Sequence, residues 1–436
     1  MGLLLLALLA GCVSLDPAPD YDEASTLVGE RSAWKPSWNA PWADGVSTWD
    51  GKSPLTLDQA VTIAFQNNRA LRGELENIAS ARADLVQSGL LPNPVLSASL
   101  GHSKVGTAVS FGLIQELNDL LLRPQRKKAA AAALRGQVLS VSDLALRLVT
   151  DVRDTHARVV HGQRGIALTH SHIELVRRGI AVAEKRLQAG EGTQLDVNRL
   201  TQELLSLQAD LVEQRLGLQT ARRSLLKLLG MADASADWEA EDTGQAADGS
   251  SISISESEAM KRAAQQRLDV QAARAAFEQR RHELSAETLG AIPDVSLGPS
   301  YESDEDNLKF LGGDLEVEIP IFDTNRARIA KARSELRKAK AEADQVIQAA
   351  VNQTRSAWLA WQSKVQQVKF FRDRVLTLAR ENLALSQRSF RAGQVDLTVV
   401  LDTQREVIQA EFKLNSLELD AATSLADLEY AAGGRL

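Results

Sequence analysis

The sequence predicts a mainly helical chain with a small β part, and three observations support this fold class. Charged residues make up 25% of the 436 residues and aromatic residues only 4%, a composition typical of long helices. Apolar residues recur at every seventh position over long stretches, which indicates coiled-coil helices. The chain also divides into two similar halves about 200 residues apart, so each pattern is present twice.

The first eleven residues are predicted to be a lipoprotein signal peptide. Residues 1–10 are nearly all Leu and Ala, and this stretch is too short to span a bilayer. It runs directly into Leu9-Ala10-Gly11-Cys12, a lipobox. Cys12 is the only cysteine, and we expect it to become the first mature residue, carrying diacylglycerol and palmitate. An internal disulfide is then excluded.

Residues 12–54 are predicted to form an extended, lipid-anchored arm. The segment shows no helical or strand period, and it is rich in proline and tryptophan. Such a segment cannot form a core alone. Its tryptophans should therefore pack on the body of the chain or on a neighbouring copy; they are Trp34, Trp38, Trp42 and Trp49.

The two halves, residues 55–230 and 252–436, are expected to repeat one order of elements. In each half, a helix ends at a proline, at Pro92 and at Pro293, and an alternating segment follows. A long helix then leads to a glycine, Gly190 or Gly393, before a returning helix. Residues 231–251 are acidic and rich in Gly, Ala and Ser, which is typical of a linker.

The heptad pattern is strongest in the long helices. One series in the first half is Val138, Ala145, Val152, Val159, Ile166, Ile173, Ile180 and Leu187. Its counterpart in the second half is Ile329, Leu336, Ala343, Ala350, Ala357, Phe371, Leu378 and Leu385, interrupted at Lys364. A helix over 126–189 would be roughly 100 Å long at about 1.5 Å per residue. It must pack on helices of similar length, as in a tube or a long hairpin.

Four segments alternate with period two, which predicts strands over 95–101, 107–117, 295–301 and 308–319. Two hairpins alone cannot close a sheet. Either they lie on the helices or several chains pool them. Their alternation suits a membrane barrel, where an open edge is not tolerated.

In this order and duplication, the segments resemble the TolC-like outer-membrane efflux family over nearly the whole chain. The likeness is carried by Leu57-Asp58-Gln59-Ala60 with Asn67-Asn68-Arg69-Ala70-Leu71, by Leu90-Leu91-Pro92-Asn93-Pro94, and by Ile319-Pro320-Ile321-Phe322-Asp323-Thr324-Asn325-Arg326. The last two segments are most similar to the heavy-metal branch of the cobalt-zinc-cadmium type.

The resemblance implies a homotrimer in the bacterial outer membrane that extends into the periplasm. Its helices would form a trimeric α-barrel, and its two β-hairpins per chain a 12-stranded membrane β-barrel. The implied function is the outer-membrane channel of a tripartite efflux system. This passive export duct would dock to a periplasmic adaptor protein and an inner-membrane pump. The residues do not identify the substrate, which could be a metal ion or a drug.

The resemblance also implies site residues. Gly190, Thr193, Gly393 and Gln394 would lie at the adaptor-contacting tips, although C-capping and N-capping alone would also explain residues of these types there. Asp196 and Asp402 match acidic positions near the closed tunnel end, where threefold repetition would make a carboxylate ring. A solvated acid in the first turn of a helix is the alternative.

Basic clusters follow the strands of both halves, and we expect them to face the anionic lipid surface. Solubility of the helix surface explains them equally well. Their members are Arg123, Arg126, Lys127, Lys128, Arg326 and Arg328, with Lys331 and Arg333 beyond.

Other functions are disfavoured by what the sequence lacks. The net charge of −7 and the scattered basic residues exclude a nucleic-acid-binding protein. No P-loop, dinucleotide fingerprint or nucleophile elbow is present, so we predict no enzymatic activity. His156 and His170 would lie about 21 Å apart along a helix, so we also predict no bound metal.

Two alternatives remain open at this point. A periplasmic adaptor lipoprotein should have one hairpin and β-rich domains, whereas this chain predicts two hairpins and only four strands. A coiled-coil scaffold without a pore is the other.

Overall fold

The computed structural model describes residues 14–38 and 49–436, except 103, 105, 232, 233, 236, 243–251, 253, 305 and 307. The predicted signal peptide, Cys12 and Trp42 lie outside the described residues. Two compact units make up the chain, each assembled from both halves of the sequence. Among the described residues, no helix combines the length and the apolar character needed to cross a membrane.

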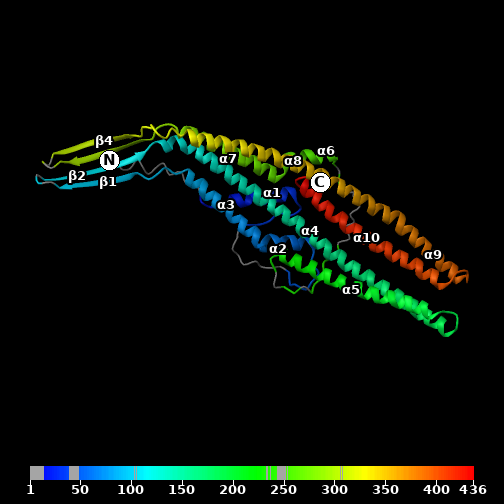
Figure 1. Cartoon of the computed structure of the whole chain (residues 1–436). Coiled ribbons are helices and arrows are strands. Elements are labelled where there is room, and N and C mark those ends of the chain that lie inside the picture. Colours follow the sequence, from blue (N-terminus) through cyan, green and yellow to red (C-terminus); the bar gives the residue numbers. More distant parts are fainter. Residues whose placement is uncertain are drawn as a thin grey trace. The chain divides into compact units, whose positions relative to one another are not determined.

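The first unit contains the sheet and the helical segments next to it, residues 73–141 and 268–348, with the chain before residue 25. Its strands are β1 (Val95–His102), β2 (Thr107–Glu116), β3 (Val295–Ser303) and β4 (Lys309–Val317), in the order β1-β2-β3-β4 (Figure 1). All three pairings are antiparallel. All four predicted strands are therefore confirmed, with bounds shifted by at most two residues.

Helices lead into and out of this sheet: α3 (Arg69–Ser88), α4 (Asn118–Gln188), α7 (Leu268–Leu289) and α8 (Arg326–Phe370). The side chain of Asn118, at the start of α4, donates to the carbonyl oxygens of Pro293 at 3.0 Å and Ile292 at 3.2 Å. These bonds join the start of α4 in one half to the chain just before β3 in the other.

The second unit contains residues 25–72, 142–267 and 349–436. Its elements are α2 (Leu57–Asn67), α5 (Gln194–Leu228), α6 (Glu256–Gln266), the π-helical segment η2 (Phe371–Leu376), α9 (Thr377–Arg391) and α10 (Leu397–Ala431), together with the distal parts of α4 and α8. The α4–α5 pair is the first hairpin, and α8–η2–α9 with α10 is the second (Figure 1).

Contacts fix the order in which these helices pack. A Cβ added at Gly162 of α4 would lie 3.4 Å from Leu218 of α5. His161 of α4 hydrogen-bonds to Asn415 of α10 at 2.8 Å. Val407 of α10 packs with Leu376 at the end of η2. The order is therefore α5, α4, α10 and then α8–η2–α9.

The heptad series of the first half is buried or half-buried, as predicted; Val138, Val152 and Val159 are at most 1% exposed. The predicted series of buried positions in the second half is wrong at its distal end, because Leu378 is 58% and Leu385 54% exposed in the single chain. The cause is η2, because a π turn takes up one extra residue and shifts the phase of the helix.

The predicted extended arm is wrong for residues 18–31, which form α1 (Ala18–Arg31). The carboxylate of Asp16 accepts a hydrogen bond from the Ala18 amide at 3.0 Å, and prolines are tolerated in a first helical turn. Tyr21, Ala24 and Val28 are buried, so one face of α1 has the helical spacing that the proline-rich composition concealed.

The tryptophans described in this segment pack on their own chain. Trp38 meets the ring of Phe65 edge-on at 6.3 Å between centroids, and Trp49 meets Trp238 at 5.4 Å. The indole of Trp34 donates to Asp58 at 2.8 Å. Of the two packing surfaces expected for these side chains, the body of the chain is the one observed.

Candidate functional site

The two hairpin turns share one geometry. Gly190 has a φ of +76° and Gly393 a φ of +70°, a conformation that favours glycine. After each glycine, an amide bonds back to the helix, Glu191 to the Arg186 carbonyl at 2.8 Å and Gln394 to the Ser389 carbonyl at 2.9 Å. Both turns thus have the hydrogen bond of a Schellman C-cap, which a non-glycine residue at these φ values would strain.

The returning helices begin differently. Thr193 and Asp196 form a capping box, in which the Thr193 hydroxyl accepts from the Asp196 amide and the Asp196 carboxylate accepts from the Thr193 amide at 3.1 Å. The Thr193 hydroxyl also donates to the Asp196 carboxylate at 2.7 Å, and this bond, together with the one from the Thr193 amide, holds the pKa of Asp196 below its usual range. At the start of α10, Asp396 makes no side-chain capping bond and lies 3.5 Å from Arg186. The Asp196 carboxylate is thus bound to the N-cap residue of its own helix.

Asp402 belongs to a charged junction where α4, α5 and α10 meet. Glu203 of α5 accepts from Arg405 of α10 at 2.8 Å, and Arg405 lies 3.3 Å from Asp402. Asp402 is 57% exposed, whereas Glu203 is 25% exposed. We call Glu203, Arg405, Asp402 and His172 the junction cluster. It joins the first hairpin to the second.

His172 completes the junction cluster from α4. Its Nε2 lies 3.4 Å from the Glu203 carboxylate, and its side chain is 8% exposed. Burial lowers the pKa of His172, so the ring is neutral at pH 7. A protonated ring would compete with Arg405 for Glu203.

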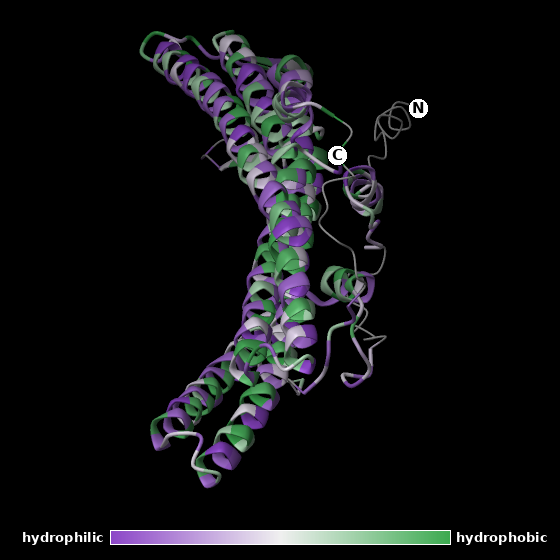
Figure 2. Ribbon diagram, turned by 90° about the vertical axis from the view of Figure 1, so that its right-hand side faces the viewer, coloured by the Kyte–Doolittle hydropathy of each residue, from purple (hydrophilic) through white to green (hydrophobic). Residues whose placement is uncertain are grey.

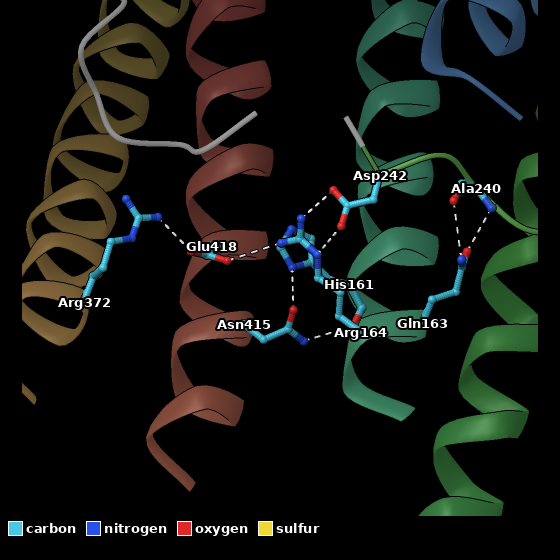
Figure 3. Close-up of polar contacts among 8 residues, drawn as sticks. All are labelled: His161, Gln163, Arg164, Ala240, Asp242, Arg372, Asn415 and Glu418. Atoms are coloured by element: carbon cyan, nitrogen blue, oxygen red, sulfur yellow. Dashed lines mark hydrogen bonds and ion pairs between the residues drawn. The ribbon is translucent and has the colours of Figure 1, made fainter. Parts of the chain in front are cut away.

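A second polar network lies farther from the turns and links four segments (Figure 3). Arg372 of η2 donates to Glu418 of α10 at 2.7 Å, and Glu418 lies 3.4 Å from Arg164 of α4. Arg164 also donates through Nε and one terminal nitrogen to the two carboxylate oxygens of Asp242, in the segment between the two repeats. The network therefore connects both hairpins to the linker.

The basic residues lie at the start of α4 and of α8, as their positions in the sequence imply. Arg126 pairs with Asp119 at 2.7 Å and Arg328 with Asp323 at 2.5 Å. Lys127, Lys128 and Arg326 are exposed, and Arg123 is half-buried. Apolar side chains nearby in sequence, including Phe322 at 100%, are also exposed.

The histidines have separate partners rather than a common centre. His156 contacts the Leu55 carbonyl at 3.0 Å, His161 contacts Asn415, and His172 faces Glu203. Within the described ranges, no group of three or more His, Cys, Asp or Glu side chains could hold a metal ion.

Sequence patterns did not reveal Glu203, Arg405, Arg164 and Glu418. Each is a charged residue in a helix that was predicted from its apolar heptad positions, and that pattern does not include it. The detectable signal was the presence of opposite charges on the helices, but assigning them as pairs requires knowing that α10 lies between α4 and the α8–η2–α9 helix.

Comparisons with known proteins agree with this arrangement. Residues 259–434 match the family model described as outer membrane efflux protein. The cobalt-zinc-cadmium resistance protein CzcC of Cupriavidus metallidurans is 25% identical over 380 residues, covering 84% of this chain and 86% of that protein. Outer membrane protein OprJ of Pseudomonas aeruginosa is 26% identical, covering 99% of this chain and 95% of that protein.

Solved structures share the fold. Crystal structures of CusC match with a TM-score of 0.72 and 20% identity, covering 92% of this chain and 98% of that one. A membrane protein from Pseudomonas aeruginosa matches with a TM-score of 0.71 and 23% identity, covering 90% and 96%. The predicted combination of long helices with a four-stranded antiparallel part is confirmed.

Proposed function

The chain is an outer-membrane efflux protein of the TolC-like family, and from this premise we propose that three copies form a lipid-anchored export duct. The chain serves as the outer-membrane channel of a tripartite efflux system and is not an enzyme. Proteins of this family form trimers in such pumps. The adaptor and scaffold alternatives are set aside on this basis.

The observation that carries the proposal is the open sheet. Within the described residues, β1 and β4 are the two ends of the strand order, and every described side chain of both strands is exposed in the single chain. Unpaired edges cannot be left in hydrocarbon, because each unsatisfied backbone group costs several kcal/mol there. Copies that join β4 to the β1 of a neighbour satisfy both edges, and three copies give twelve strands.

The lipid anchor is proposed from the sequence alone. Cys12 follows a short apolar stretch in a lipobox, and the tryptophan-rich segment behind it packs on α2 through Trp38 and on the linker through Trp49. An acyl chain on Cys12 would then hold the arm at the membrane surface.

The turns at Gly190 and Gly393 are proposed to contact the adaptor in the periplasm. Thr193 and Gln394 stand on the exposed flanks of these turns, where the side chain of Gln394 and the methyl group of Thr193 can reach a partner. An inner-membrane pump would then supply the energy that a passive duct lacks.

The constriction is proposed at Asp402 rather than equally at Asp196. The Asp196 carboxylate is occupied by its capping box, whereas Asp402 is more than half exposed beside Arg405. Three copies of Asp402 would form a carboxylate ring that attracts cations. The basic clusters near Arg126 and Arg326 are proposed to meet anionic headgroups.

The cargo we favour is a heavy-metal ion. Support comes from the likeness to a cobalt-zinc-cadmium resistance protein over 84% of this chain and from the Ile319–Arg326 segment. Export of a drug is the second candidate, favoured by the likeness to OprJ. A susceptibility panel of metals and drugs on a deletion strain distinguishes them, since only one class should become toxic.

The duct itself is tested by single-channel recording on purified full-length protein in planar bilayers. We expect cation-selective conductance, and we expect Asp402→Asn to lower the selectivity while Asp396→Asn, a matched exposed aspartate, leaves it unchanged. Absence of conductance from a protein that is folded by circular dichroism would contradict the duct.

A further inference from the structure

His172 of α4 places an imidazole ring in an apolar part of the interior. Hydrophobic and hydrophilic residues mix along the whole length of the long helices (Figure 2), but the side chains around His172 are mostly apolar. The ring and Arg405 line a cavity of about 10 Å³, whose other walls are Leu175, Val176, Gly179, Leu200 and Leu401. This volume is about that of one water sphere, so a hydrated counter-ion does not fit beside the ring.

Packing alone does not require a histidine at this position. Buried positions of the second hairpin after η2 match those of the first at a separation of 203 residues, as with Ile173 and Leu376. The counterpart of His172 is therefore Val375, which is half-buried. An apolar side chain fills this place in one hairpin, and a titratable ring fills it in the other.

The ring is poorly paired where it lies. Its Nε2 is buried without a hydrogen-bond partner among the described residues, because the Glu203 carboxylate, at 3.4 Å, is farther away than in a normal charge-assisted hydrogen bond. Glu203 of α5 and Arg405 of α10 are the charged groups that face the ring. Arg405 donates to the same Glu203 carboxylate at 2.8 Å. Two basic side chains thus stand beside one carboxylate.

The other histidines of α4 are arranged differently. His156 contacts the Leu55 carbonyl at 3.0 Å, and His161 contacts the Asn415 side chain at 2.8 Å; both partners are uncharged. His170 is exposed. Among the described histidines of α4, His172 is therefore the one that contacts an ion pair between the two hairpins.

A proton on His172 changes the balance of the junction cluster. In the closed junction, burial lowers the pKa of His172; the Glu203 carboxylate opposes this shift, and the Arg405 guanidinium adds to it. In water the ring would have an ordinary pKa of about 6.5. The open junction therefore binds more protons than the closed one as pH falls through about 6.5. Acid favours the open junction, and neutral or alkaline pH retains the closed one.

We propose that His172 is a proton-sensitive switch: when its ring takes up a proton from the periplasm, it draws Glu203 from Arg405 and loosens the contact of α10 with α4 and α5. Arg405 lies 3.3 Å from Asp402, so this change reaches the proposed constriction directly. The inference rests on the proposed duct, whose opening the switch would regulate.

Amide hydrogen exchange of the full-length protein in detergent tests the movement, after correction for the intrinsic effect of pH on exchange. We expect opening near residues 194–205 and 397–408 to rise by at most about 30-fold from pH 7.5 to pH 5, the factor set by an ordinary histidine pKa. His172→Gln should lose most of this rise. His172→Leu, which has the apolar character of Val375, is a second variant in case the first does not fold. His170→Gln, two residues away and exposed, is the matched control and should keep the rise.

Single-channel recording of the same variants at both pH values separates the switch from the duct. Acid-induced opening in both measurements, present in His170→Gln and lost in the His172 variants, supports the proposal. No rise in the wild-type protein, or a rise that both His172 variants retain, would overturn the switch and leave the duct standing. A folded protein that shows the exchange response but never conducts would contradict the duct, and with it the regulatory role of His172.

Discussion

The first and second hairpins follow one apolar pattern but are held together by different polar contacts. The α4–α5 pair has an uninterrupted 71-residue helix and a neutral hydrogen bond from Thr169 to Gln214 at 2.8 Å. The second hairpin contains η2 and ion pairs from its descending helices to α10: Lys364–Asp420, Arg372–Glu418 and Arg380–Glu411, at 2.7–2.9 Å.

A duplicated helix pair must keep its buried apolar face. The spacing of buried positions in the two hairpins differs by one residue, and the π turn of η2 restores the phase of the helix after that residue. The polar contacts have no such constraint. We therefore expect high salt to destabilise the second hairpin more than the first. A one-residue deletion should destabilise the first hairpin more than a deletion within η2 destabilises the second.

The largest effect is expected from a change of length in the first hairpin. Deleting Ser171 of α4 turns the helix beyond it by about 100° and exposes Ile173, Leu175 and Val176, now at most 4% exposed. Each such side chain contributes roughly 1.5–3 kcal/mol when buried. We expect loss of the folded protein from membranes, measured by immunoblot and protease resistance.

The matched deletion is Asp373 in η2, the counterpart of Ser171 at a separation of 202 residues. It should convert η2 to regular α-helix and leave both faces in phase, so we expect near-normal amounts and conductance. Equal damage from the two deletions would show that η2 does not absorb an extra residue.

The junction cluster should give the next largest effect. Glu203→Gln weakens the bond to Arg405 and leaves that guanidinium, whose Nε is buried without a hydrogen-bond partner among the described residues, poorly paired. The expected loss is about 1–2 kcal/mol of local stability, seen as faster hydrogen exchange near the turns. Glu213→Gln, exposed on the same helix, is the control. Unchanged exchange in Glu203→Gln would mean that the hairpins are not joined there.

Asp154 of α4 gives a pH dependence. Burial and the nearby Asp427 carboxylate raise its pKa to about 7, so the folded state binds more protons than the unfolded state between about pH 4 and pH 7. Its contribution to the free energy of unfolding is therefore present at acid pH and lost as pH rises through 7. Asp154→Asn should match the wild-type melting temperature at pH 5 and exceed it at pH 8. A gap that is the same at both pH values would contradict this.

The smallest effect is expected from the ion pairs of the second hairpin. Arg372→Gln should cost about 0.5 kcal/mol, because partly exposed pairs contribute little. The cost should shrink at high salt. Melting curves at low and high ionic strength measure it, with Arg374→Gln on the same segment as control. A loss that is independent of salt would assign Arg372 a packing role.

The heptad series and the alternating segments were sufficient to predict the helices, the four strands and the turns at Gly190 and Gly393, because apolar period and glycine are local signals. The helix α1 escaped prediction because prolines masked a short amphipathic face. The phase shift at η2 escaped because a strict seven-residue count from Ile329 passes over an inserted residue. The junction cluster depends on which helices are neighbours, which no single helix encodes.

Separate copies of the chain complete the sheet edges that one chain leaves open. Single-particle imaging of the purified full-length protein in detergent tests this assembly. We predict a threefold particle in which β4 of each copy pairs with β1 of the next. A monomer, or a particle whose sheets remain open at both edges, would contradict the account.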